Sequence, residues 1–207
     1  MAFTYFFRDM QTLELIRDNC LKSLASRQRI KIWDAGCAMG PEPYSLSIIF
    51  RENVGYMYFR NIKIIATDID QSQQFDKIIL DGIYPREQVE RIPKEILSKY
   101  FVDVDGGKYF QIIEEIRKSV SFRRHDLLTL KPIEENFDLI LCKNVLLHFS
   151  YEERIKVLTM FYNSLNVGGF LAVEQTQKIP NEIENLFVPI VSNAQLFKKS
   201  ETQAAKR

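Results

Sequence analysis

Residues 30–50 have the sequence IKIWDAGCAMGPEPYSLSIIF, in which an apolar run is followed by a loop bounded by two glycines. We predict a buried strand over Ile30–Ala35, because short apolar runs bounded by turn residues are typical of strands covered on both faces. Proline is favoured in the first turn of a helix, so Pro41 predicts a helix start, and the helical period continues to Phe50. Strand, glycine loop and helix in this order indicate an α/β fold.

The alternation of strands and helices continues on both sides of this segment. The further strands that we predict are Ile62–Thr67, Val120–Arg124, Phe137–Cys142 and Phe170–Glu174. Helical spacing of apolar residues predicts helices over Leu13–Leu24, Gln71–Leu80 and Tyr151–Leu165, the first capped by Asp9 or Thr12. Two weaker runs, Phe187–Val191 and Gln195–Lys198, are predicted to form a closing hairpin. We therefore expect one domain over residues 1–199, with a parallel sheet covered by helices and a solvated, flexible tail from Ser200.

The stretch Pro85–Ser119 interrupts this alternation. A charged helix through Ile92 and Ile96 is predicted first. Asp105-Gly106-Gly107 then separates two apolar runs, and aspartate followed by glycine in that position predicts a hairpin. The two runs are Tyr100–Val104 and Tyr109–Ile113. We expect a small antiparallel insertion on the main sheet.

The composition restricts the class of protein. A chain of 207 residues suits one sizeable domain, and 46% hydrophobic and 27% charged residues are ordinary globular values. The formal net charge of +1 gives no reason to expect nucleic acid or an anionic membrane as a partner. We expect neither a secretory leader nor a membrane span, because no long uncharged apolar run is present. Three cysteines without CxxC spacing and two histidines favour neither disulfides nor a metal site, so a reducing cytoplasm is expected.

Three residues at predicted strand ends indicate a nucleoside-containing ligand, because ligands of open α/β sheets bind beyond the carboxyl ends of the strands. Gly36 and Gly40 let the backbone approach a ligand closely, and Asp68 can accept hydrogen bonds from both hydroxyls of a ribose. The glycine spacing does not match the GxGxxG pattern of a dinucleotide pyrophosphate, which favours S-adenosylmethionine (SAM) over NAD. The alternative is structural, with a tight turn at the glycines and Asp68 as a helix cap.

Five segments resemble, in order, the motifs of the chemotaxis-receptor methyltransferases, the CheR family. Residues 4–9 are similar to the family's TxFFR[DE], residues 33–45 to WSAGCSTGEEPYS, residues 66–70 to ATDID, residues 82–84 to GIY and residues 137–149 to FDLIFCRNVLIYF. The resemblance runs from Thr4 to Phe149 and more loosely to Lys198. It implies a class I SAM-dependent methyltransferase fold, a Rossmann-like sheet with a small β-subdomain, in agreement with the predicted insertion.

The resemblance also implies a set of site residues. The predicted cofactor-binding residues, which include the two glycines already named, are Thr4, Arg8, Gly36, Gly40, Glu42, Asp68, Ile69, Asp126, Leu127, Lys143 and Asn144. Asp68 is expected on the ribose, Glu42 near the methionine end and Asp126 by the adenine. Arg8 and His148 are the predicted catalytic residues. Arg8 would orient the acceptor carboxylate, and His148 stands where the family usually has a tyrosine close to the reacting methyl group.

Four of the departures from the family pattern bear on the predicted site. Lys143 replaces an arginine and keeps the charge without the planar fork, and Asp126 replaces an asparagine and loses the amide donor. Pro41 replaces a glutamate, and His148 replaces the tyrosine. The family also usually carries an amino-terminal helical domain. We expect that domain to be missing here, either because the chain is a trimmed piece or because it is a naturally short relative.

The function that the resemblance implies is SAM-dependent methyl esterification of glutamate side chains, with S-adenosylhomocysteine (SAH) as product. The expected partner is the cytoplasmic region of methyl-accepting chemotaxis receptors, and we expect a monomer. Two alternatives remain open. One is a regulatory or scaffold domain that binds SAM or SAH without turnover, which the changes at Lys143, Asp126 and His148 permit. The other is a methyltransferase that acts on a different acceptor.

Overall fold

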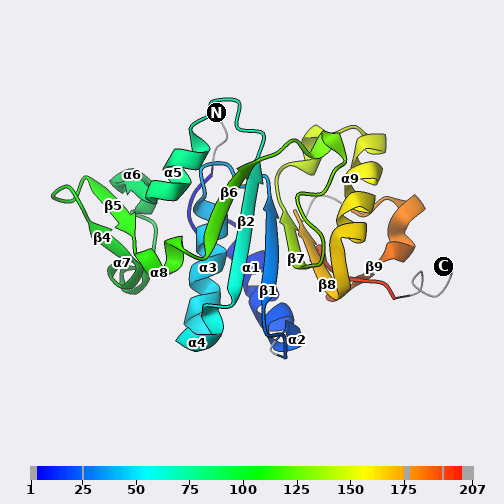
Figure 1. Cartoon of the computed structure of the whole chain (residues 1–207), viewed down its shortest axis with the longest axis horizontal. Coiled ribbons are helices and arrows are strands. Elements are labelled where there is room, and N and C mark those ends of the chain that lie inside the picture. Colours follow the sequence, from blue (N-terminus) through cyan, green and yellow to red (C-terminus); the bar gives the residue numbers. More distant parts are fainter. Residues whose placement is uncertain (1–3, 25, 175–177, 193, 202–207) are drawn as a thin grey trace.

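A seven-stranded sheet runs through the centre of the molecule (Figure 1). The structure, a computed structural model, describes residues 4–24, 26–174, 178–192 and 194–201. The strand order is β6-β2-β1-β7-β8-β10-β9. The strands are β1 (Ile30–Ala35), β2 (Ile62–Asp68), β6 (Val120–Arg124), β7 (Phe137–Cys142), β8 (Leu165–Val173), β9 (Phe187–Pro189) and β10 (Leu196–Lys199). The predicted strands and the closing hairpin are confirmed, although β8 begins at Leu165 rather than at Phe170.

Most of the sheet is parallel. The strands β6, β2, β1, β7 and β8 pair in parallel, and β10 pairs antiparallel with both β8 and β9. Ile32 of β1 lies between Ile64 of β2 and Leu139 of β7. The chain passes from β1 outward through β2 to β6 and then returns to β7 on the opposite side of β1. The strand order therefore reverses between β1 and β7, which is where ligands of such sheets bind.

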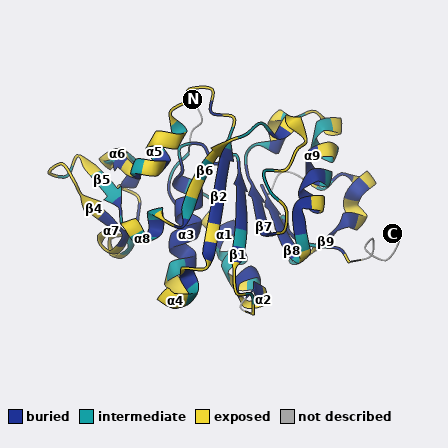
Figure 2. Cartoon of the chain, viewed as in Figure 1, coloured by how far each residue is buried: buried dark blue, intermediate teal, exposed yellow. Residues whose placement is uncertain are grey.

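Helices cover both faces of the sheet, which separates two apolar cores (Figures 1 and 2). The α-helices outside the predicted insertion, with the π-helical turn that joins α1 to α2, are α1 (Met10–Ile16), the π-helical turn (Arg17–Leu21), α2 (Lys22–Leu24), α3 (Pro41–Asn53), α4 (Tyr56–Phe59), α5 (Phe75–Asp81) and α9 (Tyr151–Ser164). Neighbouring residues of β1 point to opposite cores, as a strand requires. Ile32 packs in the core that contains Tyr44 of α3, whereas Trp33 packs against Phe161 of α9 at a ring distance of 5.1 Å. Trp33 and Tyr44 are fully buried and belong to the cores.

The predicted insertion forms a second, three-stranded antiparallel sheet in the order β3-β5-β4. Its strands are β3 (Ile83–Pro85), β4 (Phe101–Asp103) and β5 (Tyr109–Ile112), with α8 (Glu114–Arg117) leading back to β6. The β4–β5 hairpin turns at residues 105–107, as predicted, and pairs Val102 with Gln111. Sequence analysis missed β3, because a run of three residues is too short to show a strand period.

Four local predictions differ from the structure. The single charged helix is two helices, α6 (Arg86–Val89) and α7 (Lys94–Tyr100), because Pro93 interrupts it. The helix expected from Gln71 begins at Phe75. Asp9 precedes α1 without capping an amide through its side chain. Ser200, the predicted start of the tail, is buried and its amide donates to the Leu186 carbonyl at 2.9 Å, while residues 202–207 lie outside the described residues.

Candidate active site

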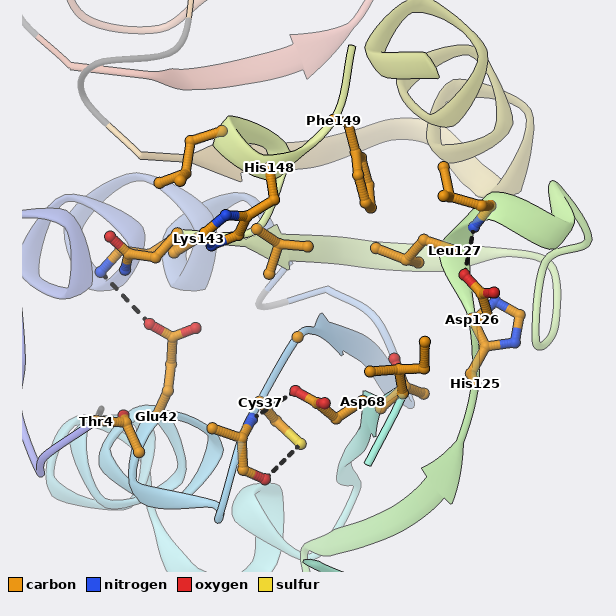
Figure 3. Close-up of a pocket in the computed structure, with 18 of the residues that line it drawn as sticks. Thr4, Cys37, Glu42, Asp68, His125, Asp126, Leu127, Lys143, His148 and Phe149 are labelled. Carbon is orange, nitrogen blue, oxygen red and sulfur yellow. Dashed lines mark hydrogen bonds and ion pairs between the residues drawn. The ribbon is translucent and has the colours of Figure 1, made fainter. Parts of the chain in front are cut away.

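The carboxyl ends of β1, β2, β6 and β7 surround a cavity of about 920 Å³ (Figure 3). It lies at the reversal of strand order between β1 and β7. The predicted site residues that line it are Thr4, Arg8, Gly36, Glu42, Asp68, Ile69, Asp126, Leu127, Lys143, Asn144 and His148. Residues from the first segment of the chain, the glycine loop and the ends of three further strands thus meet around one cavity.

Gly36 places the loop backbone directly at the cavity. Its φ of +103° is unfavourable for residues with a side chain, and a Cβ atom here would lie only 2.1 Å from Cγ2 of Val145. The amides of Gly36 and Cys37 both donate to the carbonyl of Thr67, at 2.7 and 3.0 Å. The loop after β1 is therefore fixed to the end of β2 and packed closely against the segment after β7.

Gly40, at the other end of the same loop, does not line the cavity. It packs on the side of the loop that faces α5 and β3. Its φ is +97°, and an added Cβ atom would lie 2.7 Å from Cγ1 of Ile79 and 2.9 Å from the hydroxyl oxygen of Tyr84. That hydroxyl donates to the carbonyl of Met39 at 2.8 Å. Because Tyr84 belongs to β3, this side chain connects the small sheet to the glycine loop.

Asp68, at the end of β2, faces the glycine loop. Its Oδ2 accepts a hydrogen bond from the amide of Ala38 at 3.0 Å, and its Oδ1 accepts one from the amide of Asp70 at 3.1 Å. A carboxylate has roughly four acceptor positions, so these two bonds leave capacity for the hydroxyls of a ligand. The structural alternative for Asp68 does not hold, because the amides at the start of α5, those of Gln74 and Phe75, donate to Asp70 instead.

A cluster of charged side chains forms one end of the cavity. Lys143, which is only 3% exposed, places its Nζ 3.0 Å from Oδ2 of Asp9 and 3.5 Å from Oε2 of Glu42. Beside it, Nη2 of Arg8 donates to Oδ1 of Asn144 at 3.3 Å. The segment before α1 therefore contacts the end of β7 through two polar pairs, and it completes this wall of the cavity.

The electrostatics of this end are set by burial and by the two cations. Burial raises the pKa of Glu42, although the nearby charges of Lys143 and Arg8 oppose the increase. Burial also acts to raise the pKa of Asp9, but the Lys143 ammonium and the hydrogen bonds from Thr12 together outweigh it, so the pKa of Asp9 is lowered. Glu42 thus carries a proton more readily than an ordinary glutamate does.

The opposite end of the cavity is formed by the loop after β6 (Figure 3). Oδ1 of Asp126 accepts a hydrogen bond from the amide of Leu128 at 2.9 Å, and Leu127 is buried beside it. The His125 ring lies 5.7 Å from the Trp33 ring, and burial lowers the pKa of His125. This end combines an apolar surface with one carboxylate, which suits a flat heterocyclic base better than it suits a charged group.

Sequence analysis missed several residues that line the cavity. They are Cys37, Ala38, Thr67, Gln71, His125, Leu128, Val145, Leu147 and Phe149. They lie at or soon after the ends of predicted strands, in loops, in short 3₁₀ helices or, for Thr67, in β2 itself, and this position is the one signal that marks them. Most have apolar or small side chains, and such residues carry no chemical pattern that separates a ligand wall from core.

The sequence matches the family profile described as "CheR methyltransferase, SAM binding domain" over residues 2–195. The chain belongs to the CheR family. The profile describes a SAM-binding domain, so SAM is the cofactor of this family's domain. The cavity suits SAM. Asp68 offers acceptors for a ribose, and Glu42 offers a carboxylate toward a cationic methionine end. The volume also lies within the range of roughly 300–1,000 Å³ that is usual for small-molecule sites.

Curated relatives of this CheR-family chain are chemotaxis protein methyltransferases. The protein of that name from Listeria innocua is 35% identical over 85% of this chain and 65% of its own length. A second, from Borreliella burgdorferi, is 30% identical over 85% of this chain and 64% of its own length. The CheR-family chain thus spans slightly less than two thirds of the relatives that it matches.

Solved structures confirm the class I SAM methyltransferase fold of this CheR-family domain. The rRNA methyltransferase aviRa from Streptomyces viridochromogenes superposes with a TM-score of 0.58, covering 95% of this chain and 86% of the other. The sequence identity is only 14%, so this likeness concerns the fold alone.

Within the described ranges, no group of three His, Cys, Asp or Glu side chains is arranged to hold a metal ion. In the same part of the chain, no helix combines the length and the apolar character needed to cross a bilayer.

Proposed function

We propose that this domain transfers the methyl group of SAM to glutamate side chains in the cytoplasmic region of chemotaxis receptors, and that it acts there as a cytoplasmic monomer. The observation that supports this most is the assembly of Arg8, Glu42, Asp68, Lys143 and Asn144 around one cavity in a chain of the CheR family. The relatives' shared name, chemotaxis protein methyltransferase, supports the receptor as acceptor.

SAM, when bound, supplies an activated methyl group on a sulfonium centre. The residues of this chain bind and orient the reactants. Asp68 would accept hydrogen bonds from the ribose, and Glu42 would face the methionine end. A glutamate acceptor is already ionised at neutral pH, so no general base is needed. Arg8, whose guanidinium is held by Asn144, would pair with the acceptor carboxylate and align its oxygen with the methyl carbon.

His148 distinguishes this proposed site from the family pattern. It lines the cavity on the segment after β7, next to Phe149 (Figure 3). An imidazole is smaller than a phenol ring and carries its polar atoms within the ring, so it closes the cavity near the acceptor side less completely than a tyrosine would. Water that enters there would solvate the carboxylate and slow the displacement.

The direct test is transfer of labelled methyl groups from SAM to cytoplasmic fragments of chemotaxis receptors. We expect incorporation that is lost in mild alkali, as a carboxyl ester should be. Arg8→Ala should lower kcat by about 100-fold or more, because a charged contact made in the transition state is lost. Arg8→Lys is the matched control and should retain part of the activity. Alkali-stable incorporation would instead indicate a different acceptor.

A second candidate is a domain that binds SAM or SAH without turnover, and the presence of His148 in the cavity wall favours it. Calorimetric titration with each compound separates the two functions. Saturable binding with no transfer to any receptor fragment, and no gain of transfer in His148→Tyr, would support the binding role. Absence of binding to both compounds would contradict both candidates.

A further inference from the structure

A buried carboxyl group lies beneath the charged end of the cavity, and the mechanism above does not use it. Asp34 of β1 has no exposed surface, and neither of its carboxylate oxygens has a hydrogen-bond donor among the described residues. Its side chain points to the same face of the sheet as Ile32, toward α3. There it lies within hydrogen-bonding reach of Glu42. The corresponding position of the family motif quoted above, WSAGC, holds a serine.

Most of the titratable groups around Asp34 are acidic. The titratable and charged groups that face the Asp34–Glu42 pair from the surrounding elements are Asp9 and Arg8 before α1, Cys37 in the glycine loop, Asp68 at the end of β2, Cys142 and Lys143 at the end of β7, and Glu174 after β8. The ammonium group of Lys143 lies close to both Asp9 and Glu42, so it does not compensate the charge of Glu42 alone. Burial raises the pKa of the Cys37 and Cys142 thiols, so these two stay neutral.

Two adjacent buried carboxylates are unfavourable when both are ionised. Each is only an acceptor, so the oxygens of Asp34 remain without a donor in that state, and the two negative charges repel. One proton between Asp34 and Glu42 removes both problems, since the protonated acid donates to the other. Burial raises the pKa of Asp34 well above its ordinary value, and the charge of Glu42 adds to this against the opposing charge of Lys143.

We propose that Asp34 and Glu42 share one proton in the free domain and release it to solvent when SAM binds, so that Asp34 makes cofactor affinity dependent on pH. Asp34 does not line the cavity, and it acts through Glu42 as a positioning residue. The inference rests on the cofactor binding within the proposed function and does not depend on methyl transfer.

The direction of the effect follows from the charges. SAM carries two positive charges, the sulfonium and the ammonium, against one carboxylate, so its net positive charge on the side of Glu42 stabilises the ionised pair. Binding removes little further water from the pair, because Asp34 is already fully buried and the Glu42 side chain is only 10% exposed. The pair's pKa is therefore lower in the complex than in the free domain. Between those two values, affinity for SAM rises with pH, by at most about tenfold per pH unit for one proton.

The shared proton can be tested without cofactor. Infrared spectra of the free domain at about pH 7, where ordinary carboxyls are ionised, should show the carbonyl band of a protonated carboxylic acid. The band should disappear in Asp34→Asn and in Asp34→Ser, which installs the residue of the family motif. Glu174→Gln removes a neighbouring acid outside the pair and is the matched control, so it should keep the band. A wild-type spectrum without the band overturns the proposal.

Proton release is measured by calorimetric titration of the whole chain with SAM in phosphate and in Tris at the same pH. The dependence of the heat on buffer ionisation gives the protons released. Measured across the window of pH in which the domain stays folded, this value should approach about one between the pair's pKa in the complex and its pKa in the free domain. The release should be lost in Asp34→Asn and kept in Glu174→Gln. Saturable binding with no release across that window, or release that persists in Asp34→Asn, overturns the proposal. Absence of SAM binding would count against the proposed function, and the infrared band would still decide the shared proton.

Discussion

The two sheets of this domain differ in the kind of side chain that they bury and expose. The seven-stranded sheet buries charge at its carboxyl edge, where Asp34 and Lys143 are nearly inaccessible. The three-stranded sheet exposes apolar side chains, with Val102 54% and Tyr109 45% accessible. Among the described residues that line the cavity, none comes from the small sheet. Cofactor binding and the surface of the small sheet are therefore encoded by separate sets of residues.

The two regions are connected through Phe101 of β4, which packs edge-on against Phe6 at a ring distance of 5.3 Å, and through Tyr84. Tyr84 of β3 is buried, donates to the Met39 carbonyl of the glycine loop, and packs edge-on against Phe6 at a ring distance of 4.9 Å. Phe6 precedes Arg8 by two positions in the chain, so the same tyrosine supports both the glycine loop and the segment that carries Arg8. Substitutions on either side of this contact test how independent the two regions are.

The largest expected effect comes from Asp68→Ala. It removes the proposed ribose acceptor and leaves the amides of Ala38 and Asp70 without their partner. We expect the affinity for SAM to fall by about 100-fold, the equivalent of two or more hydrogen bonds to a charged group. Calorimetric titration measures this. Asp70→Ala, which uncaps α5 but changes no lining residue, should leave the affinity close to that of the wild type. An unchanged affinity in Asp68→Ala would contradict the site placement.

Gly40→Ala is expected to have the next largest effect. The new Cβ would meet Ile79 and the Tyr84 hydroxyl at 2.7 and 2.9 Å, in a backbone conformation with φ of +97°. We expect the free energy of unfolding to fall by about 2 kcal/mol, from strain and displaced packing. Urea denaturation followed by circular dichroism gives this value. Gly55→Ala is the control, since a Cβ there meets nothing within 4 Å. Equal stability of the two variants would show that the contact with the small sheet is loose.

Tyr84→Phe tests the connection itself with a smaller change. The ring stays against Phe6, but the buried Met39 carbonyl loses its donor, which costs about 1 kcal/mol. If the small sheet holds the glycine loop, the affinity for SAM should fall several-fold along with the stability. A loss of stability without any change in affinity would mean that the two sheets are functionally independent.

The smallest effect is expected from Val102→Ser on the exposed edge strand β4. Val102 is 54% accessible and does not reach the cavity, so both SAM affinity and the free energy of unfolding should stay within about 0.5 kcal/mol of the wild type. Titration and denaturation of the same preparation check both quantities. A clear change in SAM affinity would show a second route from the small sheet to the cavity.

Much of the fold was predictable because its signals are local. The strand Ile30–Ala35 and the hairpin at residues 105–107 were predicted from apolar runs and turn residues, and both are confirmed. The short strand β3 was missed because its three residues gain their partners only through β5, far along the chain. The break at Pro93 was also missed, since the charged residues on both sides continue the same helical period.

The candidate site was predictable where a residue type stands at a recognisable place in the sequence. It was unpredictable where a residue's role depends on contacts that form only in the folded chain. Asp68 stood out because it is an acid at the end of the second predicted strand, whereas Glu42 was predicted only through the resemblance to the family's motifs. The role of Asp34 did not stand out, because a charged residue in a strand shows its burial and its neighbour only after α3 has packed against β1. The link between Asp9 and Lys143 likewise joins residues that are distant in the chain, and no spacing rule predicts it.

The position of Thr4 on the cavity wall has a practical consequence for preparing the protein. Any affinity tag or fluorescent fusion joined to the amino terminus is attached within a few residues of the cavity mouth, where it competes with the acceptor for access. The chain leaves the sheet at β10, which lies two strands beyond β7 and outside the four strands that surround the cavity. Tags for binding assays therefore belong at the carboxyl end, or should be cleaved from the amino end before any titration.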